Sequence, residues 1–168
     1  MDIAFLSSTM VTLLKALPVT LALFALSVTI GCVLALVIVW MRVGGNRYLA
    51  AFAKGYIFVF RGSPLLIQMF LVFYGLAQFD FIRNGPLWPL LREPFVCAVL
   101  SLALCTGGYS AEIFRGGIRS VPPREIEAAR AIGMSGFLLV RRIIAPIALR
   151  YALPAYSTEV VLMMKSTS

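Results

Sequence analysis

Ser120-Val-Pro-Pro-Arg-Glu-Ile-Glu-Ala-Ala-Arg-Ala-Ile-Gly-Met-Ser-Gly-Phe137 is a polar stretch in a chain that is otherwise strongly apolar. Its two prolines, Pro122 and Pro123, predict the start of a helix, because proline is tolerated in the first helical turn. Gly133 predicts the end of that helix, and Ser135 predicts the cap of a second one. The stretch therefore predicts a short helix, a sharp turn and another short helix.

The second short helix is expected to end near Arg141 and Arg142, since positive charge is favoured at a helix C-terminus. Pro146 is then expected to break the helix. The predicted hairpin covers residues 120–146. It is too polar to cross a bilayer, so we expect it between membrane spans.

The composition outside this hairpin is that of an integral membrane protein. The chain has 168 residues, of which 61% are hydrophobic and only 13% are charged, whereas soluble domains average about 25% charged residues. Apolar runs of roughly 20 residues predict an all-α protein, because a membrane barrel would show alternation in ten-residue segments. The net charge is +8, but the cations flank the apolar runs, so nucleic-acid binding is not expected.

The apolar runs predict several membrane spans in a single domain that covers residues 1–168. An amphipathic interfacial helix is expected before the first of them, over residues 1–17. Pro64 is expected to end or kink a helix inside the second apolar stretch. The four predicted spans are residues 18–41, 57–78, 94–114 and 151–168.

The distribution of basic residues predicts the orientation of the chain. Residues 42–47 contain two arginines and residues 115–150 contain seven, whereas the two arginines of residues 79–93 are balanced by Asp80 and Glu93. Cytoplasmic loops are enriched in Lys and Arg. We therefore expect residues 42–47 and 115–150 in the cytoplasm and the N-terminus outside.

The parts that membrane-embedded enzymes need are scarce in this sequence. It has no histidine, its aspartates are Asp2 and Asp80, and Cys32, Cys97 and Cys105 stand alone in apolar runs. No metal-ligand spacing is present, and no glycine-rich phosphate loop with Lys-Ser/Thr is present. We expect no catalytic residue, no metal site, no cofactor and no ATP hydrolysis by this chain.

Several blocks resemble a known family of transporters. Glu127-Ala128-Ala129, with Gly133 after three intervening residues and Leu153-Pro154 further on, resembles the EAA loop of ATP-binding-cassette importer permeases. Further blocks are similar to the polar amino acid branch, which serves histidine, arginine, glutamine and opines. These blocks are Arg61-Gly62-Ser63-Pro64-Leu65-Leu66, Glu112-Ile113-Phe114-Arg115-Gly116-Gly117-Ile118 and Lys165-Ser166-Thr167-Ser168.

The resemblance implies a multi-pass permease in the bacterial plasma (inner) membrane. It implies that Glu127, Ala128, Ala129 and Gly133 form a coupling hairpin that contacts a cytoplasmic ATPase. Its further implied partners are a second permease subunit, identical or similar, a solute-binding protein outside, and an amino acid substrate. Members of the branch usually continue through another span after the Lys-Ser-Thr-Ser block, so this chain looks short by its last span.

Ionisable groups at membrane depth are expected to be functional or paired. For Glu112 a salt bridge with Arg115 is favoured over contact with a substrate, because the two residues are one helical turn apart. Glu159 lies deeper, so a polar cavity that holds a substrate ammonium group is a candidate environment. Two weaker substrate candidates are Tyr109 and Gln68, for which packing or contact between helices is the alternative.

Arg61 and Thr106 also have two interpretations. Arg61 could meet a substrate carboxylate, but a contact with lipid phosphate from the start of a span is favoured. Thr106 could also contact a substrate, but helix packing is favoured, and the pair Gly107-Gly108 is expected to allow close helix packing. Just before Glu159 the chain reads Ser157-Thr158, where the family more often has Gly-Asn.

Two other functional classes compete with an importer subunit. A secondary amino acid carrier driven by an ion gradient would leave the hairpin without a partner, and its uptake would survive ATP depletion. A membrane-embedded enzyme would need a cluster of His, Asp or Ser groups at membrane depth, which the sequence lacks.

Overall fold

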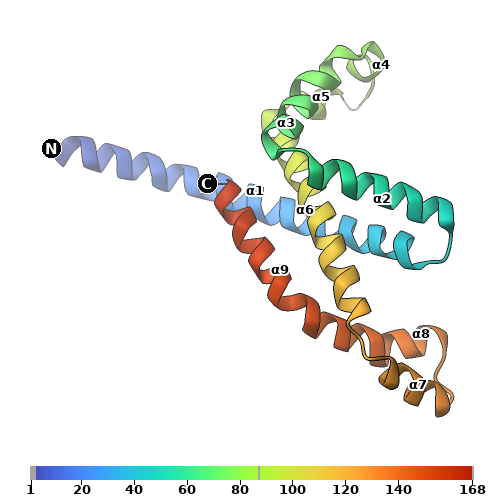
Figure 1. Cartoon of the computed structure of the whole chain (residues 1–168). Coiled ribbons are helices and arrows are strands. Elements are labelled where there is room, and N and C mark those ends of the chain that lie inside the picture. The colour runs from blue at the N-terminus through green and yellow to red at the C-terminus, as the bar shows by residue number, and fades with distance from the viewer. Residues whose placement is uncertain (1–2, 87, 168) are drawn as a thin grey trace.

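The computed structural model describes residues 3–86 and 88–167, which are mostly helical and contain no strand. Ser168, the last residue of the Lys-Ser-Thr-Ser block, therefore lies outside the described residues. Figure 1 shows a long N-terminal helix that is crossed by a second long helix, with short helices near one end of this second helix and the hairpin beyond its other end. The predicted all-α class is confirmed.

The N-terminal helix α1 runs from Ile3 to Val43 without interruption. The helix continues through Pro18, so the predicted interfacial segment and the predicted first span belong to one helix. Apolar helices tolerate the loss of one backbone bond where nearby side chains help to satisfy the freed groups. The carbonyl that Pro18 leaves without a backbone donor is that of Leu14, four residues earlier.

A tight turn reverses the chain after α1. Gly45 has φ +79°, which favours glycine. The Asn46 side chain then caps helix α2 (Arg47–Gly62) by accepting from the backbone N–H of Tyr48 at 2.9 Å. α2 runs back alongside α1 (Figure 1).

The chain bends by 108° between α2 and the next helical segment, residues 65–78. The predicted effect of Pro64 is confirmed, and a span over residues 57–78 stays a prediction. Proline has no N–H and cannot continue the backbone bonding of α2. After the bend come α3 (Leu65–Phe70), a π-helical turn η1 (Leu71–Gly75) and a 3₁₀ turn η2 (Leu76–Gln78).

Two one-turn helices, α4 (Asp80–Arg83) and α5 (Trp88–Leu91), follow η2. Helix α6 then runs from Pro94 to Arg119, beyond the expected end of the span at residue 114. Its packing against α1 is the most extensive contact between elements, and it also contacts α2 and α9. α6 is thus the centre of the fold.

Small residues bring α6 close to its neighbours. A Cβ at Gly107 would lie 2.9 Å from Cδ2 of Leu34 on α1, and a Cβ at Gly31 would lie 3.0 Å from Cβ of Thr106. Both distances are too short for a side chain without movement of the neighbour. The expected packing role of Gly107 and Thr106 is confirmed.

The hairpin begins as expected and ends differently. Helix α7 (Pro123–Ala131) is followed by α8 (Gly136–Leu139), a π-helical turn η3 (Val140–Ile144) and the long helix α9 (Ala145–Thr167). The expected break at Pro146 is wrong. In the π turn the backbone bonding has shifted by one residue, since the N–H of Ala145 bonds to the carbonyl of Val140. Pro146, which has no N–H to donate, therefore lies where the bonding pattern changes and does not interrupt the helix.

Within the part of the chain that the structure describes, two helices have the length and composition of membrane spans, Thr9–Val43 and Pro94–Arg119, and the bent pair α2 with residues 65–78 could form a third. α9 has 23 residues, but it is not among these helices, so a span at residues 151–168 stays a prediction. The number of spans and the side of the N-terminus stay predictions as well. Many large apolar side chains on α1 are exposed, as expected for contact with lipid or with other subunits.

Candidate functional site

The turn of the hairpin is a helix-terminating motif built on Gly133. This glycine has φ +85°, and its N–H donates to the carbonyl of Arg130 at 2.9 Å. The N–H of Met134 donates to the carbonyl of Ala129 at 3.0 Å. These two bonds are those of a Schellman motif. They fix the direction in which the chain leaves α7, and the predicted stop at Gly133 is confirmed.

α7 has one buried side and one open side. Ala129 lies on the buried side of α7, and α7 contacts α8 and η3. Glu127 and Ala128 are exposed, as is Ile132. The open side of α7 therefore offers a carboxylate, a small residue and an apolar side chain for contact with another protein.

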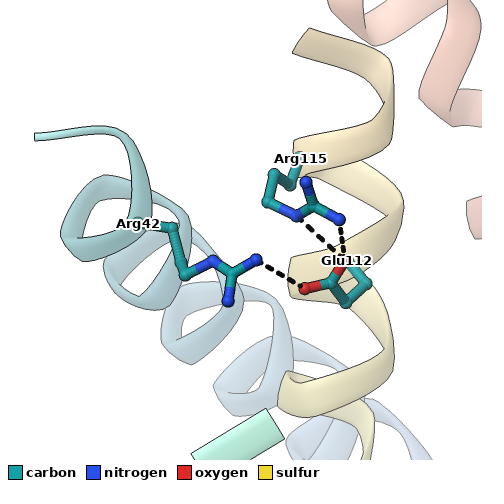
Figure 2. A network of polar contacts seen from close by, with 3 residues as sticks. All are labelled: Arg42, Glu112 and Arg115. Carbon is teal, nitrogen blue, oxygen red and sulfur yellow. Dashed lines mark hydrogen bonds and ion pairs between the residues drawn. The ribbon is translucent and has the colours of Figure 1, made fainter. Parts of the chain in front are cut away.

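Glu112 on α6 is held between two arginines (Figure 2). Its Oε2 accepts from Nε of Arg115 at 2.9 Å and also from Nη2 of the same side chain. Its Oε1 lies 3.4 Å from Nη2 of Arg42 at the end of α1. The expected pair with Arg115 is confirmed. Arg42 was missed, because a contact across 70 positions leaves no local signal in the sequence.

Glu112→Gln should destabilise the protein by about 2–3 kcal/mol, because Arg42 and Arg115 would keep their positive charges in a mostly buried place without a counter-charge. The measurement is the midpoint of thermal unfolding of the purified protein in detergent. Glu125→Gln is the matched control, because Glu125 is exposed on the first turn of α7. Equal midpoints for the two variants would contradict a structural role for Glu112.

Two of the four substrate candidates line one cavity. A space of about 270 Å³ lies between α3, α6 and α9, and both Tyr109 and Glu159 contribute to its wall. Glu159 is half-buried. The cavity wall also contains Thr106, whose hydroxyl donates to the sulfur of Met163 at 3.3 Å and joins α6 to α9. The full set of lining residues is Leu65, Cys105, Thr106, Tyr109, Glu159, Leu162, Met163 and Ser166.

Tyr109 also lines a second, more open space of about 380 Å³, together with Arg61. The guanidinium carbon of Arg61 lies 4.9 Å from the centre of the Tyr109 ring, a cation–π contact. Arg61 and Glu159 form no salt bridge with any residue that the structure describes. Tyr109 thus lines both the space with Glu159 and the space with Arg61, and neither charged group has a salt-bridge partner among the described residues.

Gln68 has a different place. It is buried on α3, and its Nε2 donates to the carbonyls of Phe60 and Ser63, both at 3.0 Å, and to Oγ of Ser63 at 2.9 Å. These bonds satisfy carbonyl groups that the bend at Pro64 leaves free. Gln68 does not line the cavity of Tyr109 and Glu159, so its geometry is that of a structural residue.

Comparison with known proteins connects this geometry to a transport family. Residues 27–168 match the family described as the binding-protein-dependent transport system inner membrane component. The chain belongs to this family. It is therefore a membrane transport subunit and not an enzyme, as expected.

The individual proteins to which this chain is similar are named as permeases. The chain is 53% identical over 167 residues to the octopine transport system permease protein OccM of Rhizobium meliloti, with 99% of the chain and 68% of that protein covered. It is 50% identical over 169 residues to the nopaline transport system permease protein NocM of Agrobacterium fabrum, with 100% and 70% covered. Against the histidine/lysine/arginine/ornithine permease HisM of Escherichia coli K12 the identity is 46% over 151 residues, with 89% and 63% covered.

Solved structures of transporters share the fold. A crystal structure of an amino acid ABC transporter with histidines matches with a TM-score of 0.81 at 37% identity, covering 99% of this chain and 75% of that one. A chain of the MetNI methionine ABC transporter in an inward-facing conformation matches with a TM-score of 0.71 at 19% identity, covering 91% and 70%. None of these relatives supports the secondary carrier or the membrane enzyme.

Proposed function

We propose that this chain is the transmembrane subunit of an ATP-driven importer for polar amino acids or opines, and that it lines the substrate pathway. The observation that carries this proposal is the pair of spaces around Tyr109, one with Glu159 and the other with Arg61. The named substrates of the relatives include octopine, nopaline and basic amino acids. Such compounds carry both positive and negative groups, which a site with one carboxylate and one guanidinium can bind.

Each charged residue has a proposed task in substrate binding. The Glu159 carboxylate accepts hydrogen bonds from a substrate ammonium or guanidinium group, and Arg61 donates to a substrate carboxylate. Tyr109 positions Arg61, because the Arg61 guanidinium lies over its ring. A zwitterion would complete the charge pairing that the two residues lack within the chain. Glu112 is excluded from this task, since both of its oxygens already face arginines.

The exposed side of α7 is the proposed contact with a cytoplasmic ATPase. Glu127 would accept hydrogen bonds from an arginine of the ATPase, and Ala128 would permit close approach of its surface. Ala129 and Gly133 fix the helix to the rest of the chain, so a movement imposed on α7 is passed to α9 as the motion of a rigid body. A second permease subunit and a solute-binding protein outside complete the assembly, in the bacterial inner membrane with the N-terminus outside.

The test of this function is the purification of the tagged permease from its native membrane. We expect an ATPase subunit and a second permease subunit to co-purify, and the ATPase rate in liposomes to rise when a binding protein loaded with a basic amino acid or an opine is added. Uptake that survives ATP depletion but stops with a protonophore would instead support an ion-driven carrier.

Glu159→Gln should reduce uptake of a cationic substrate by at least about tenfold, because the loss of one charge-assisted hydrogen bond costs about 1.5–3 kcal/mol. Transport into liposomes that contain the complete complex measures the effect. Ser157→Ala is the matched control on α9, since Ser157 is exposed and its hydroxyl bonds to the carbonyl of Leu153 in its own helix. Unchanged uptake by the Glu159 variant would remove this residue from the pathway.

A further inference from the structure

A third space in the fold has no part in the substrate pathway or in the ATPase contact. It is a cleft of about 370 Å³ between the C-terminal ends of α1 and α6 and the middle of α2. Four basic side chains line it, together with three apolar residues. The lining residues are Arg42, Val43, Ala50, Lys54, Arg115, Ile118 and Arg119.

The positive charge of this cleft is only partly compensated. Glu112 holds Arg42 and Arg115 by salt bridges, and one carboxylate neutralises one of the four cations. Lys54 and Arg119 have no carboxylate within salt-bridge distance among residues 3–86 and 88–167. The fold thus brings together three uncompensated positive charges, which repel one another unless an anion lies between them.

The surroundings of the cleft indicate which anion it takes. The cleft lies where α1 and α6, the two helices of membrane-spanning length, both end, so it is at the level of lipid headgroups. Trp40, one turn before the end of α1, is 68% exposed, as is typical of residues at a membrane interface. Exposed apolar side chains on α1 continue from there toward the N-terminus, at Leu36, Val37 and Val33, and offer a surface for acyl chains.

We propose that this cleft binds the phosphate group of an anionic phospholipid, with its acyl chains against the exposed face of α1. Arg42 and Arg115 are held in place by Glu112 (Figure 2) and can each donate two parallel N–H groups to phosphate oxygens. Lys54 and Arg119 supply further positive charge from α2 and α6. Basic pockets between membrane helices on the cytoplasmic side are known to take such headgroups. This inference requires only a membrane-embedded chain, so it stands apart from the proposed substrate site.

The test uses the permease purified from its native membrane with the subunits that accompany it. Native mass spectrometry with added phosphatidylglycerol measures lipid binding, and phosphatidylcholine is the neutral comparison. We expect phosphatidylglycerol to bind more tightly than phosphatidylcholine. The double variant Lys54→Gln/Arg119→Gln should weaken phosphatidylglycerol binding on the order of 30-fold, because it removes two cations from the cleft. It leaves the Glu112 salt bridges in place.

Arg47→Gln/Arg150→Gln is the control, since it removes the same charge from exposed positions that do not line the cleft, and it should bind phosphatidylglycerol as the unmodified protein does. Equal losses in the two double variants, or no preference for phosphatidylglycerol, would overturn the proposal. Displacement of the lipid by millimolar inorganic phosphate would identify a free anion as the occupant and would overturn the assignment to a lipid. Failure of substrate transport would leave this result unaffected, because the assay measures no transport.

Discussion

Gly117→Ala is expected to destabilise the fold by about 3 kcal/mol, near the upper end of what overpacking costs in a well-packed core. A Cβ at this position would lie 2.5 Å from the backbone carbonyl oxygen of Ala148, 3.0 Å from Cβ of Ala152 and 3.3 Å from the Ala152 nitrogen. Two of these atoms belong to the backbone of α9, which cannot rotate out of the way. α6 and α9 would have to separate where the hairpin joins them.

The neighbouring glycine provides a control with the same chemistry. A Cβ at Gly116 meets nothing within 4 Å, and alanine is about 0.5–1 kcal/mol more favourable than glycine inside a helix. Gly116→Ala should therefore keep or slightly raise the midpoint of thermal unfolding in detergent, whereas Gly117→Ala should lower it and reduce the yield of folded protein. Similar midpoints for both variants would contradict the close contact of α6 with α9.

Glu127→Arg is expected to abolish most of the ATPase stimulation by substrate, with a loss of at least about tenfold. The substitution replaces an acceptor of charge-assisted hydrogen bonds by a cation that repels the proposed arginine of the ATPase. Glu127 is exposed, and neither of the salt bridges among the described residues involves it, so the permease itself should fold normally. Co-purification of the ATPase and uptake into liposomes measure the effect.

Glu125→Arg is the matched control for this charge reversal, because Glu125 is exposed on the same helix but in its first turn. We expect a much smaller loss there if the contact centres on Glu127 and Ala128. A Glu127 variant that retains a bound ATPase and full uptake would place the contact elsewhere. An intact ATPase complex without uptake would still support coupling through α7, since binding and transmission of movement are separate steps.

Part of the hairpin could be predicted because it depends on local chemistry. Pro123 opens α7, and Gly133 ends it with a positive φ that few other residues adopt. The continuation of the helix through Pro146 could not be predicted, because it depends on a π turn whose backbone bonding has no clear sequence signature. α1 likewise continues through Pro18, since a proline indicates the loss of a backbone bond but not whether the surroundings tolerate that loss.

The contacts of the candidate site were also only partly predictable. The pair of Glu112 and Arg115 could be predicted, because the two residues are one helical turn apart, and the candidates Tyr109 and Glu159 line one cavity. Arg42 could not be predicted as the second partner of Glu112. The ring contact of Arg61 with Tyr109 could not be predicted either, and a lipid contact of the exposed Arg61 stays a prediction. Gln68 had the right chemistry for a ligand, but its amide is used to stabilise the bend.

The membrane class, the all-α fold, the polar hairpin and its glycine turn could all be predicted from the residues alone. These features follow from composition and from the conformational limits of single residues, so no distant partner is needed to specify them. Three other features depend on the packing of helices against one another: which of two adjacent glycines touches α9, which carboxylate is already paired and which one faces a cavity. Those outcomes depend on the angle at which helices cross, and that angle is set by side chains far apart in the chain.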